Sequence, residues 1–277
     1  MLVFTGQTSK AMYWLSHPTI HDYYQKRSTA YCSNHWVNYI AESIGNPSEK
    51  KKILSMGCGE GALERHLCNI TKNWTIDAID FCKDNIEKSI LLSGDLAGIR
   101  IKYFCDDFSN YLDSSVHESH YDAIIYNMSL HHAPDPYTLL LQTKTKLAAN
   151  GVLILNEYIG PARLQVSGQI RKIIDYTITN LLASEGSIRG SYHYPSIERV
   201  IKADPSEAIN PAIIPYAVSE LFQNTRFNPI SSSFLSNVTE HFKALSTGDA
   251  ATLCFLDSFL LAQGILDADY QLIIASI

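Results

Sequence analysis

The chain has 277 residues, of which 46% are hydrophobic and 18% are charged, and its formal net charge is −6. This composition is typical of a globular protein and excludes a disordered or fibrous chain. A nucleic-acid partner is not expected, because proteins that bind long polyanions carry a basic face. The single run of lysines, Lys50–Lys52, is interpreted as the solvated entrance to a strand.

Location and metal content follow from the cysteines, the histidines and the apolar stretches. The six cysteines have no CxxC spacing, which indicates reduced thiols. The N-terminus has no signal-peptide pattern, and no window reaches the roughly 18 apolar residues of a membrane span. His17 and His21 have helical spacing, but Pro18 interrupts it and no third ligand is evident. We therefore expect a cytoplasmic protein without a membrane segment or a metal, and nothing in the sequence favours one oligomeric state.

The first 46 residues are rich in aromatic residues and histidine and lack strand-like alternation. They predict two or three short helices, the clearest over 33–44, which Gly45 and Pro47 end. We expect residues 1–46 to form a helical lid.

From residue 51, short apolar runs alternate with helix-length segments, which is the pattern of βαβ units. The predicted strands are 52–56, 75–79, 101–104, 123–127 and 152–156, and the predicted helices lie near 60–70, 83–96 and 136–148. The strands are almost continuously apolar, as in a sheet covered on both faces. Residues 47–157 are therefore predicted to form an α/β Rossmann-like core.

The pattern weakens after the fifth strand and then becomes regular again. Residues 158–216, with a helix near 166–184 and breakers such as Gly186 and Gly190, predict a helical cap, because a plain loop of this length is uncommon. Residues 217–277 are predicted to return to the core with a helix over 216–224, a strand over 228–235, a helix over 250–263 and a strand over 270–276. The two late strands would complete a seven-stranded, mostly parallel sheet with an antiparallel edge.

A glycine-rich loop follows the first strand directly and precedes a helix. Gly57, Gly59 and Gly61 suit a place where the backbone turns sharply and approaches a ligand, beside the free N–H groups of a helix N-terminus. The spacing is G-x-G-x-G, with Ala62 where a dinucleotide loop has its third glycine. An NAD-binding loop is therefore disfavoured.

Acidic residues end the next two strands. Asp80 ends the second strand, where a carboxylate can accept both hydroxyls of a ribose and repels a 2′-phosphate, which disfavours NADP. After the third strand, Asp107 can accept from an adenine amino group while Phe108 covers the ring, and Asp107 can equally be a helix cap. Both interpretations remain open.

Polar groups also follow the fourth strand, in the run Asn127-Met128-Ser129-Leu130-His131-His132, at the sheet edge where open α/β sheets bind ligands. Together, the glycine loop, the two acidic strand ends and this run resemble the class I S-adenosylmethionine (SAM)-dependent methyltransferases, over about residues 50–157. The segments 156–165, 204–209 and 261–266 look like those of a bacterial methyltransferase subfamily.

The resemblance implies a cofactor site for SAM, which leaves as S-adenosylhomocysteine (SAH). By it the glycine loop would wrap the methionine part, Asp80 the ribose, Asp107 with Phe108 the adenine, and Asn127 with Leu130 would line the sulfonium end. The expected cofactor-binding residues are Gly57, Cys58, Gly59, Gly61, Asp80, Phe81, Asp107, Phe108, Asn127 and Leu130. The family often has an acid two positions before the first glycine, where this chain has Ser55. Glu60, Glu64 or a backbone carbonyl would then receive the SAM amino group.

Methyl transfer depends mainly on positioning, and a base is needed only for a hydroxyl acceptor. The expected catalytic residues are His131, His132 and Tyr158, although the two histidines can instead hold the backbone of their loop. The expected substrate-binding residues are Tyr24, Arg27, Glu157, Arg163 and Gln165. The alternative for Arg163 is that it pairs with Glu157 or Glu207 and pins the cap.

We therefore expect a SAM-dependent methyltransferase that acts on a hydroxyl of a small molecule or glycan. The alternatives are N- or C-methylation of a natural product, and a protein that binds SAM or SAH without turnover, which the missing acid at Ser55 would favour. An NAD-dependent oxidoreductase is disfavoured by the glycine spacing.

Overall fold

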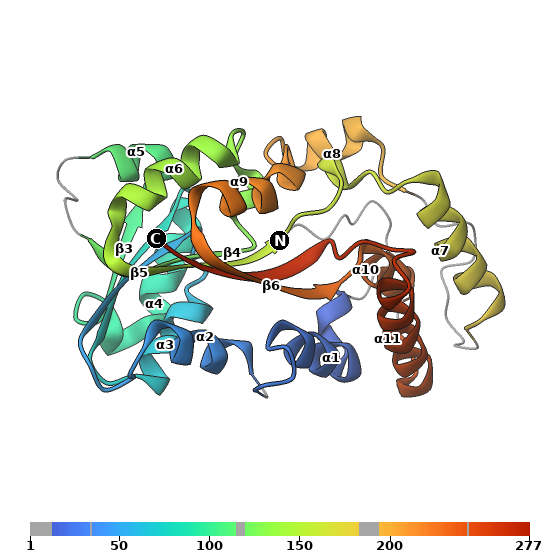
Figure 1. Cartoon of the computed structure of the whole chain (residues 1–277), viewed down its shortest axis with the longest axis horizontal. Coiled ribbons are helices and arrows are strands. Elements are labelled where there is room, and N and C mark those ends of the chain that lie inside the picture. Colours follow the sequence, from blue (N-terminus) through green and yellow to red (C-terminus); the bar gives the residue numbers. More distant parts are fainter. Residues whose placement is uncertain (1–12, 34, 115–119, 183–193, 243) are drawn as a thin grey trace.

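The computed structural model describes residues 13–33, 35–114, 120–182, 194–242 and 244–277 (Figure 1). Within these ranges a seven-stranded sheet has the order β3-β2-β1-β4-β5-β7-β6. Its strands are β1 (Lys51–Met56), β2 (Trp74–Asp80), β3 (Ile101–Cys105), β4 (Tyr121–Asn127), β5 (Leu147–Tyr158), β6 (Gln223–Ser231) and β7 (Tyr270–Ser276). The predicted α/β fold with a seven-stranded sheet is confirmed.

The position of the antiparallel strand in the sheet differs from the prediction. β1 pairs in parallel with β2 and β4, and β4 pairs in parallel with β5. β7 is antiparallel to both of its neighbours, β5 and β6. The antiparallel strand therefore lies one position inside the sheet, and the edge strand is β6.

Helices cover both faces of the sheet, as the apolar strands predict (Figure 1). One face packs against α1 (Pro18–Ser28), α2 (Trp36–Ile44), α3 (Ala62–Ile70), α10 (Ser233–Glu240) and α11 (Thr247–Ala262). The other face packs against α5 (Phe108–Asp113), α6 (Pro136–Lys146) and α9 (Ile214–Leu221). α4 (Lys83–Ser93) lies against β2 and β3. Two apolar layers, one on each side of the sheet, hold the core together.

The late strand was predicted about five residues too far along the chain. The structure ends β6 at Ser231 and begins α10 at Ser233. Phe234, Leu235 and Val238 are fully buried, and this spacing of one and three residues is that of a helix face. The apolar residues after Ser231 therefore belong to the helix rather than to the strand.

The described parts of the regions predicted as lid and cap contain short helices. α1 packs against β6 and α11, and α2 packs against α3 and β5. The cap region, residues 158–216, contains α7 (Gly168–Asn180), which packs against α10, and α8 (Ile197–Ala203). The predicted breakers Gly186 and Gly190 lie outside the described residues. In the part of the chain that the structure describes, no helix is both long enough and apolar enough to span a membrane.

Candidate functional site

The glycine loop after β1 needs glycine for two separate reasons. Gly57, Gly59 and Gly61 have φ angles of +77°, +53° and +74°, a region that side chains disfavour. A Cβ at Gly57 would lie 2.4 Å from the Cβ of Ser129, and one at Gly61 would lie 2.5 Å from the hydroxyl of Tyr103. A Cβ at Gly59 would meet nothing within 4 Å. The loop is thus closely packed at both ends and open at its middle.

Asp80 holds the middle of this loop. Its Oδ2 accepts a hydrogen bond of 2.8 Å from the backbone N–H of Gly59. Its Oδ1 accepts from the backbone N–H of Cys82 at 2.9 Å and from Nδ2 of Asn85 at 3.2 Å. The carboxylate therefore connects the loop to the start of α4, and its contact with a ribose stays a prediction.

A second carboxyl group lies beneath the loop, where the sequence has a serine in place of an acid. The hydroxyl of Ser55 donates to Oε1 of Glu64, whose side chain is fully buried. Oε2 of Glu64 has no hydrogen-bond partner among the described residues. Burial raises the pKa of Glu64 to about 7. A buried oxygen without a partner is costly, and a cationic ligand would satisfy it.

The segment after β3 carries Asp107 and Phe108, which are predicted to meet an adenine, and Phe81, another predicted cofactor-binding residue, follows β2. Asp107 is the N-cap of α5 and accepts from the backbone N–H of Ser109 at 2.9 Å, as the helix-cap interpretation requires. The ring of Phe108 packs edge-on against Tyr126, with centroids 6.0 Å apart. Phe81 is 74% exposed, which leaves its ring free to cover a ligand. The adenine contacts stay predictions.

Glu157 at the end of β5 organises the loop that follows β4. Its side chain is fully buried, and Oε1 accepts from the backbone N–H groups of Ser129 and Leu130 at 2.7 and 2.6 Å. Its Oε2 lies 2.7 Å from Nδ1 of His131. The hydroxyl of Ser129 donates to the carbonyl of Met56, beside the glycine loop. The carboxylate of Glu157 thus contacts protein groups on both oxygens, and its predicted contact with substrate stays a prediction.

Beyond Glu157, His131 meets a segment from far along the chain. Its Nε2 lies 3.7 Å from Oε1 of Glu207. The neighbouring His132 places Nδ1 3.1 Å from the hydroxyl of Ser206 and 3.8 Å from a carboxylate oxygen of Asp204. Burial by itself lowers the pKa of His131, but the carboxylates of Glu157, Glu207 and Asp204 together raise it above its ordinary value. Burial and the neighbouring His131 lower the pKa of His132.

Other predicted residues form a chain of polar contacts beside this cluster. The hydroxyl of Tyr24 donates to Oδ1 of Asn156, whose Nδ2 donates to Oδ1 of Asn127. The ring of Tyr158 packs edge-on against His131, with centroids 6.2 Å apart, and its hydroxyl donates to a backbone carbonyl. Tyr24 of α1 is thereby connected to the ends of β4 and β5. The side chain of Leu130 is fully buried in the core.

Arg163 joins the turn after β5 to the segment that carries Glu207. Its Nη1 donates to the backbone carbonyls of Pro205 and Glu207 at 2.8 and 2.9 Å. The predicted pinning of the cap is observed, through carbonyls rather than a carboxylate. Gln165 donates to the carbonyls of Arg163 and Pro195 at 2.9 Å. The binding of substrate by either residue stays a prediction.

Arg27 has contacts at another place in the fold. Its Nε donates to the carbonyl of Ile230 at 3.1 Å, and its Nη1 lies 3.5 Å from the hydroxyl of Ser258. These contacts join α1 to β6 and α11. The structure therefore gives Arg27 a position between these elements rather than beside His131.

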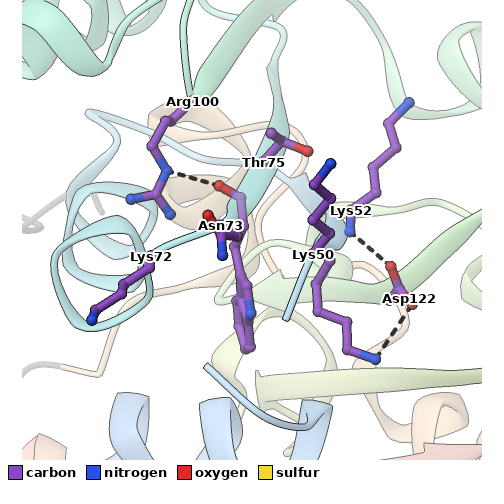
Figure 2. Close-up of a pocket in the computed structure, with 9 residues that line it drawn as sticks. Lys50, Lys52, Lys72, Asn73, Thr75, Arg100 and Asp122 are labelled. Atoms are coloured by element: carbon purple, nitrogen blue, oxygen red, sulfur yellow. Dashed lines mark hydrogen bonds and ion pairs between the residues drawn. The ribbon is translucent and has the colours of Figure 1, made fainter. Parts of the chain in front are cut away.

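A basic hollow of about 570 Å³ lies at the opposite edge of the sheet, where β1 and β2 begin (Figure 2). It is lined by Lys50, Lys51, Lys52, Lys72, Asn73, Trp74, Thr75, Arg100 and Asp122. Arg100 donates to the carbonyls of Cys68, Thr71 and Trp74, and Lys51 lies 3.6 Å from a carboxylate oxygen of Asp122. Arg100 and Lys51 therefore already have partners within the protein, and the hollow is separate from the glycine loop.

Comparison with known proteins agrees with this architecture. A family model described as a methyltransferase domain matches residues 23–183, which is more than half of the chain. The chain belongs to this methyltransferase family. The predicted enzyme class, a SAM-dependent methyltransferase, is thereby confirmed.

One curated protein and one solved structure are similar to this chain. The ubiquinone biosynthesis O-methyltransferase of Actinobacillus pleuropneumoniae serotype 7 (strain AP76) is 23% identical over 211 residues, which are 73% of this chain and 80% of the relative. A structure of a candidate sarcosine dimethylglycine methyltransferase from Galdieria sulphuraria is 13% identical, with a TM-score of 0.51 over 87% of this chain and 82% of its own. The second likeness concerns the fold alone.

The polar cluster around His131 and His132 is only partly predicted from the sequence. The sequence predicts Glu207 only as an alternative partner of Arg163, and the contacts of Asp204, Ser206 and Glu207 with the two histidines are seen in the structure. The signal that was present is the dense polar run Asp204-Pro205-Ser206-Glu207, in a chain with few charged residues. Nothing in it says which strand end it meets.

Proposed function

We propose that this methyltransferase transfers a methyl group from SAM to a hydroxyl of a small molecule or glycan. The observation that carries the choice of a hydroxyl is the buried Glu157–His131 pair, with 2.7 Å between Oε2 and Nδ1, at the sheet edge beside the glycine loop. An imidazole oriented by a carboxylate is suited to accept a proton. A hydroxyl must lose its proton when it is methylated, whereas a neutral amine can lose its proton after the transfer.

The proposed cofactor site fits the residues that are present. In it the open middle of the glycine loop faces the methionine part of SAM. Oε2 of Glu64, which has no hydrogen-bond partner among the residues that the structure describes, receives the ammonium group in place of an acid at Ser55. Asp80 would accept from the ribose, Phe81 and Phe108 would cover the adenine, and Asp107 would accept from its amino group. SAM supplies an electrophilic methyl carbon on its sulfonium.

The proposed acceptor site lies around His131, His132, Tyr158 and Glu207. There the acceptor oxygen would form its bond to the methyl carbon as the carbon–sulfur bond breaks, and the hydroxyl proton would pass to this cluster. Glu157 fixes the orientation of His131, and Arg163 fixes the segment that carries Glu207. The curated relative from Actinobacillus is named as an O-methyltransferase, which agrees with the choice of a hydroxyl.

Calorimetric titration of the protein with SAM, SAH and NAD in parallel tests the cofactor. We expect binding of SAM and SAH with micromolar affinity, weakened in Asp80→Asn, and no binding of NAD. Binding of NAD alone, or of none of the three, would contradict the proposal.

A methyl-transfer assay then tests the acceptor class with paired compounds that differ only in carrying a hydroxyl or an amine at one position. We expect methylation of the hydroxyl member of a pair, and loss of turnover in His131→Gln with SAM affinity unchanged. Turnover of amines only would favour the alternative of N-methylation, and a His131→Gln variant of full activity would remove the role of His131.

A further inference from the structure

Three potential metal ligands meet at the proposed acceptor site. One nitrogen of His131, one nitrogen of His132 and one carboxylate oxygen of Glu207 all lie within 4.8 Å of one another. Nε2 of His131 and Oε1 of Glu207 are 3.7 Å apart, too far for a hydrogen bond. Two ligands at about 2.1 Å from one ion are separated by a comparable distance. Two histidines and one carboxylate are a ligand set typical of divalent transition metals.

The orientation of His131 is that of a metal ligand with an outer partner. An ionised carboxylate accepts hydrogen bonds only, so Nδ1 of His131 carries the hydrogen that Glu157 receives at 2.7 Å. In the neutral ring the lone pair then lies on Nε2, which is the nitrogen next to Glu207. Histidines that bind metals commonly donate their other N–H to a carboxylate in this way. Glu157 is itself fixed by two backbone N–H groups.

The segment that supplies Glu207 is fixed to the same loop. The backbone N–H of Ile209 lies 3.3 Å from the carbonyl of His131, and Arg163 donates to the carbonyl of Glu207. Ala208 has a φ of +46°, and this backbone conformation is held in place because the carbonyl of Ala208 accepts from the backbone N–H of Arg163 at 2.6 Å. Strained backbone that is held by its surroundings is typical of functional sites. The three ligands are therefore brought together by specific contacts.

We propose that His131, His132 and Glu207 bind a divalent cation of the Zn²⁺ class. The proposal rests on the proposed function and deepens it, since three protein ligands leave a coordination position for the oxygen of the acceptor. Glu157 behind His131 and Asp204 beside His132 add negative charge around the ion. With the cation bound, Nε2 of His131 is a ligand, and the acceptor hydroxyl, whose pKa the cation lowers, loses its proton to water instead of to the imidazole.

Calorimetric titration with Zn²⁺ tests the site, on full-length protein first treated with a chelator and then freed of it. We expect one Zn²⁺ per chain, and an affinity at least about tenfold weaker in Glu207→Gln. Glu157→Gln should weaken it by about 10- to 100-fold through the orientation of His131. His66→Gln is the matched control, because His66 packs against His35 outside the cluster, and the affinity of this variant for Zn²⁺ should be unchanged. Co²⁺ should give visible absorption bands that Glu207→Gln lacks.

Titration of the same preparations with SAM separates this proposal from the proposed function. We expect Glu207→Gln to bind SAM like the unchanged protein, which confines its defect to the cation. Absence of Zn²⁺ binding, or equal affinity in Glu207→Gln, would overturn the cation site even where SAM binds. Failure of the unchanged protein to bind SAM would overturn the proposed function, whatever its affinity for Zn²⁺.

Discussion

The two halves of the carboxyl edge of the sheet are built in different ways. The half at β1, β2 and β3 uses backbone groups and glycines, with Asp80 fixing the loop through the N–H of Gly59. The half at β4 and β5 uses side chains, and its polar cluster is completed by a segment 74 positions away, through the contact of His132 with Ser206. The first half is therefore built on one glycine loop that neighbouring strand ends hold in place, whereas the second depends on the packing of the cap region.

Glycine substitutions give the largest expected effect and test the close packing of the first half. Gly57→Ala should lose about 4 kcal/mol of stability, because overpacking against Ser129 adds to the strain of a positive φ. Gly59→Ala should lose only about 1 kcal/mol, because its Cβ meets nothing. Urea unfolding measures both variants. Equal losses would mean that the contact with Ser129 does not limit the loop.

Glu157→Gln tests whether the second half depends on one buried charge. We expect a loss of about 3 kcal/mol in the free energy of unfolding, because His131 and two backbone N–H groups lose an ionised partner. The affinity for SAM should change little. The exposed pair of Lys83 and Glu87 offers a control, since Glu87→Gln should cost less than about 0.5 kcal/mol. A large loss of SAM affinity in Glu157→Gln would mean that the two halves are not independent.

The pH dependence of SAM binding tests whether Glu64, beside the glycine loop of the first half, contacts the cofactor. Its pKa of about 7 means that the carboxyl group is mostly neutral at pH 6 and mostly ionised at pH 8. The proposed contact with an ammonium group needs the ionised form, so SAM affinity should rise by about tenfold over this range. Calorimetry at several pH values measures the rise, and in Glu64→Gln it should vanish. A persistent rise would assign the effect to another group.

The same group has the opposite effect on the stability of the free protein. Because folding raises the pKa of Glu64 from 4.5 to about 7, its contribution is fully present below pH 4.5 and is lost as the pH rises towards 7. Unfolding measured across this range should show a steeper fall in the unchanged protein than in Glu64→Gln. Parallel curves would contradict the burial of Glu64.

The smallest expected effect concerns the connection between the cap region and the second half. Arg163→Lys should lose about 1 kcal/mol, because an ammonium cannot reproduce the two hydrogen bonds of the guanidinium to Pro205 and Glu207. Turnover should fall while SAM affinity stays constant. Arg199→Lys, at an exposed position in α8, is the control and should change neither. A fall in SAM affinity would connect Arg163 to the cofactor half instead.

The fold class, the five parallel strands and the glycine loop can be predicted from the sequence, because each depends on a short local pattern. Apolar runs of strand length and glycines directly after a strand need no knowledge of distant segments. The same reasoning misplaced the late strand, since the apolar residues of α10 follow β6 without a break in hydrophobicity. It also placed the antiparallel strand at the edge, because the order of neighbours in a sheet is not a local property.

Which polar groups meet cannot be predicted from local patterns and is seen only in the folded chain. The sequence leaves Glu60, Glu64 and a backbone carbonyl open as replacements for the acid that is missing at Ser55, and in the fold the carboxyl group of Glu64 in α3 accepts from the hydroxyl of Ser55. No spacing rule predicts that Glu207 lies beside His131, because the two residues meet only when the cap region folds back over the ends of β4 and β5. Contacts between segments far apart in sequence are set by the packing of the whole chain, so the local pattern around each residue does not specify its partner.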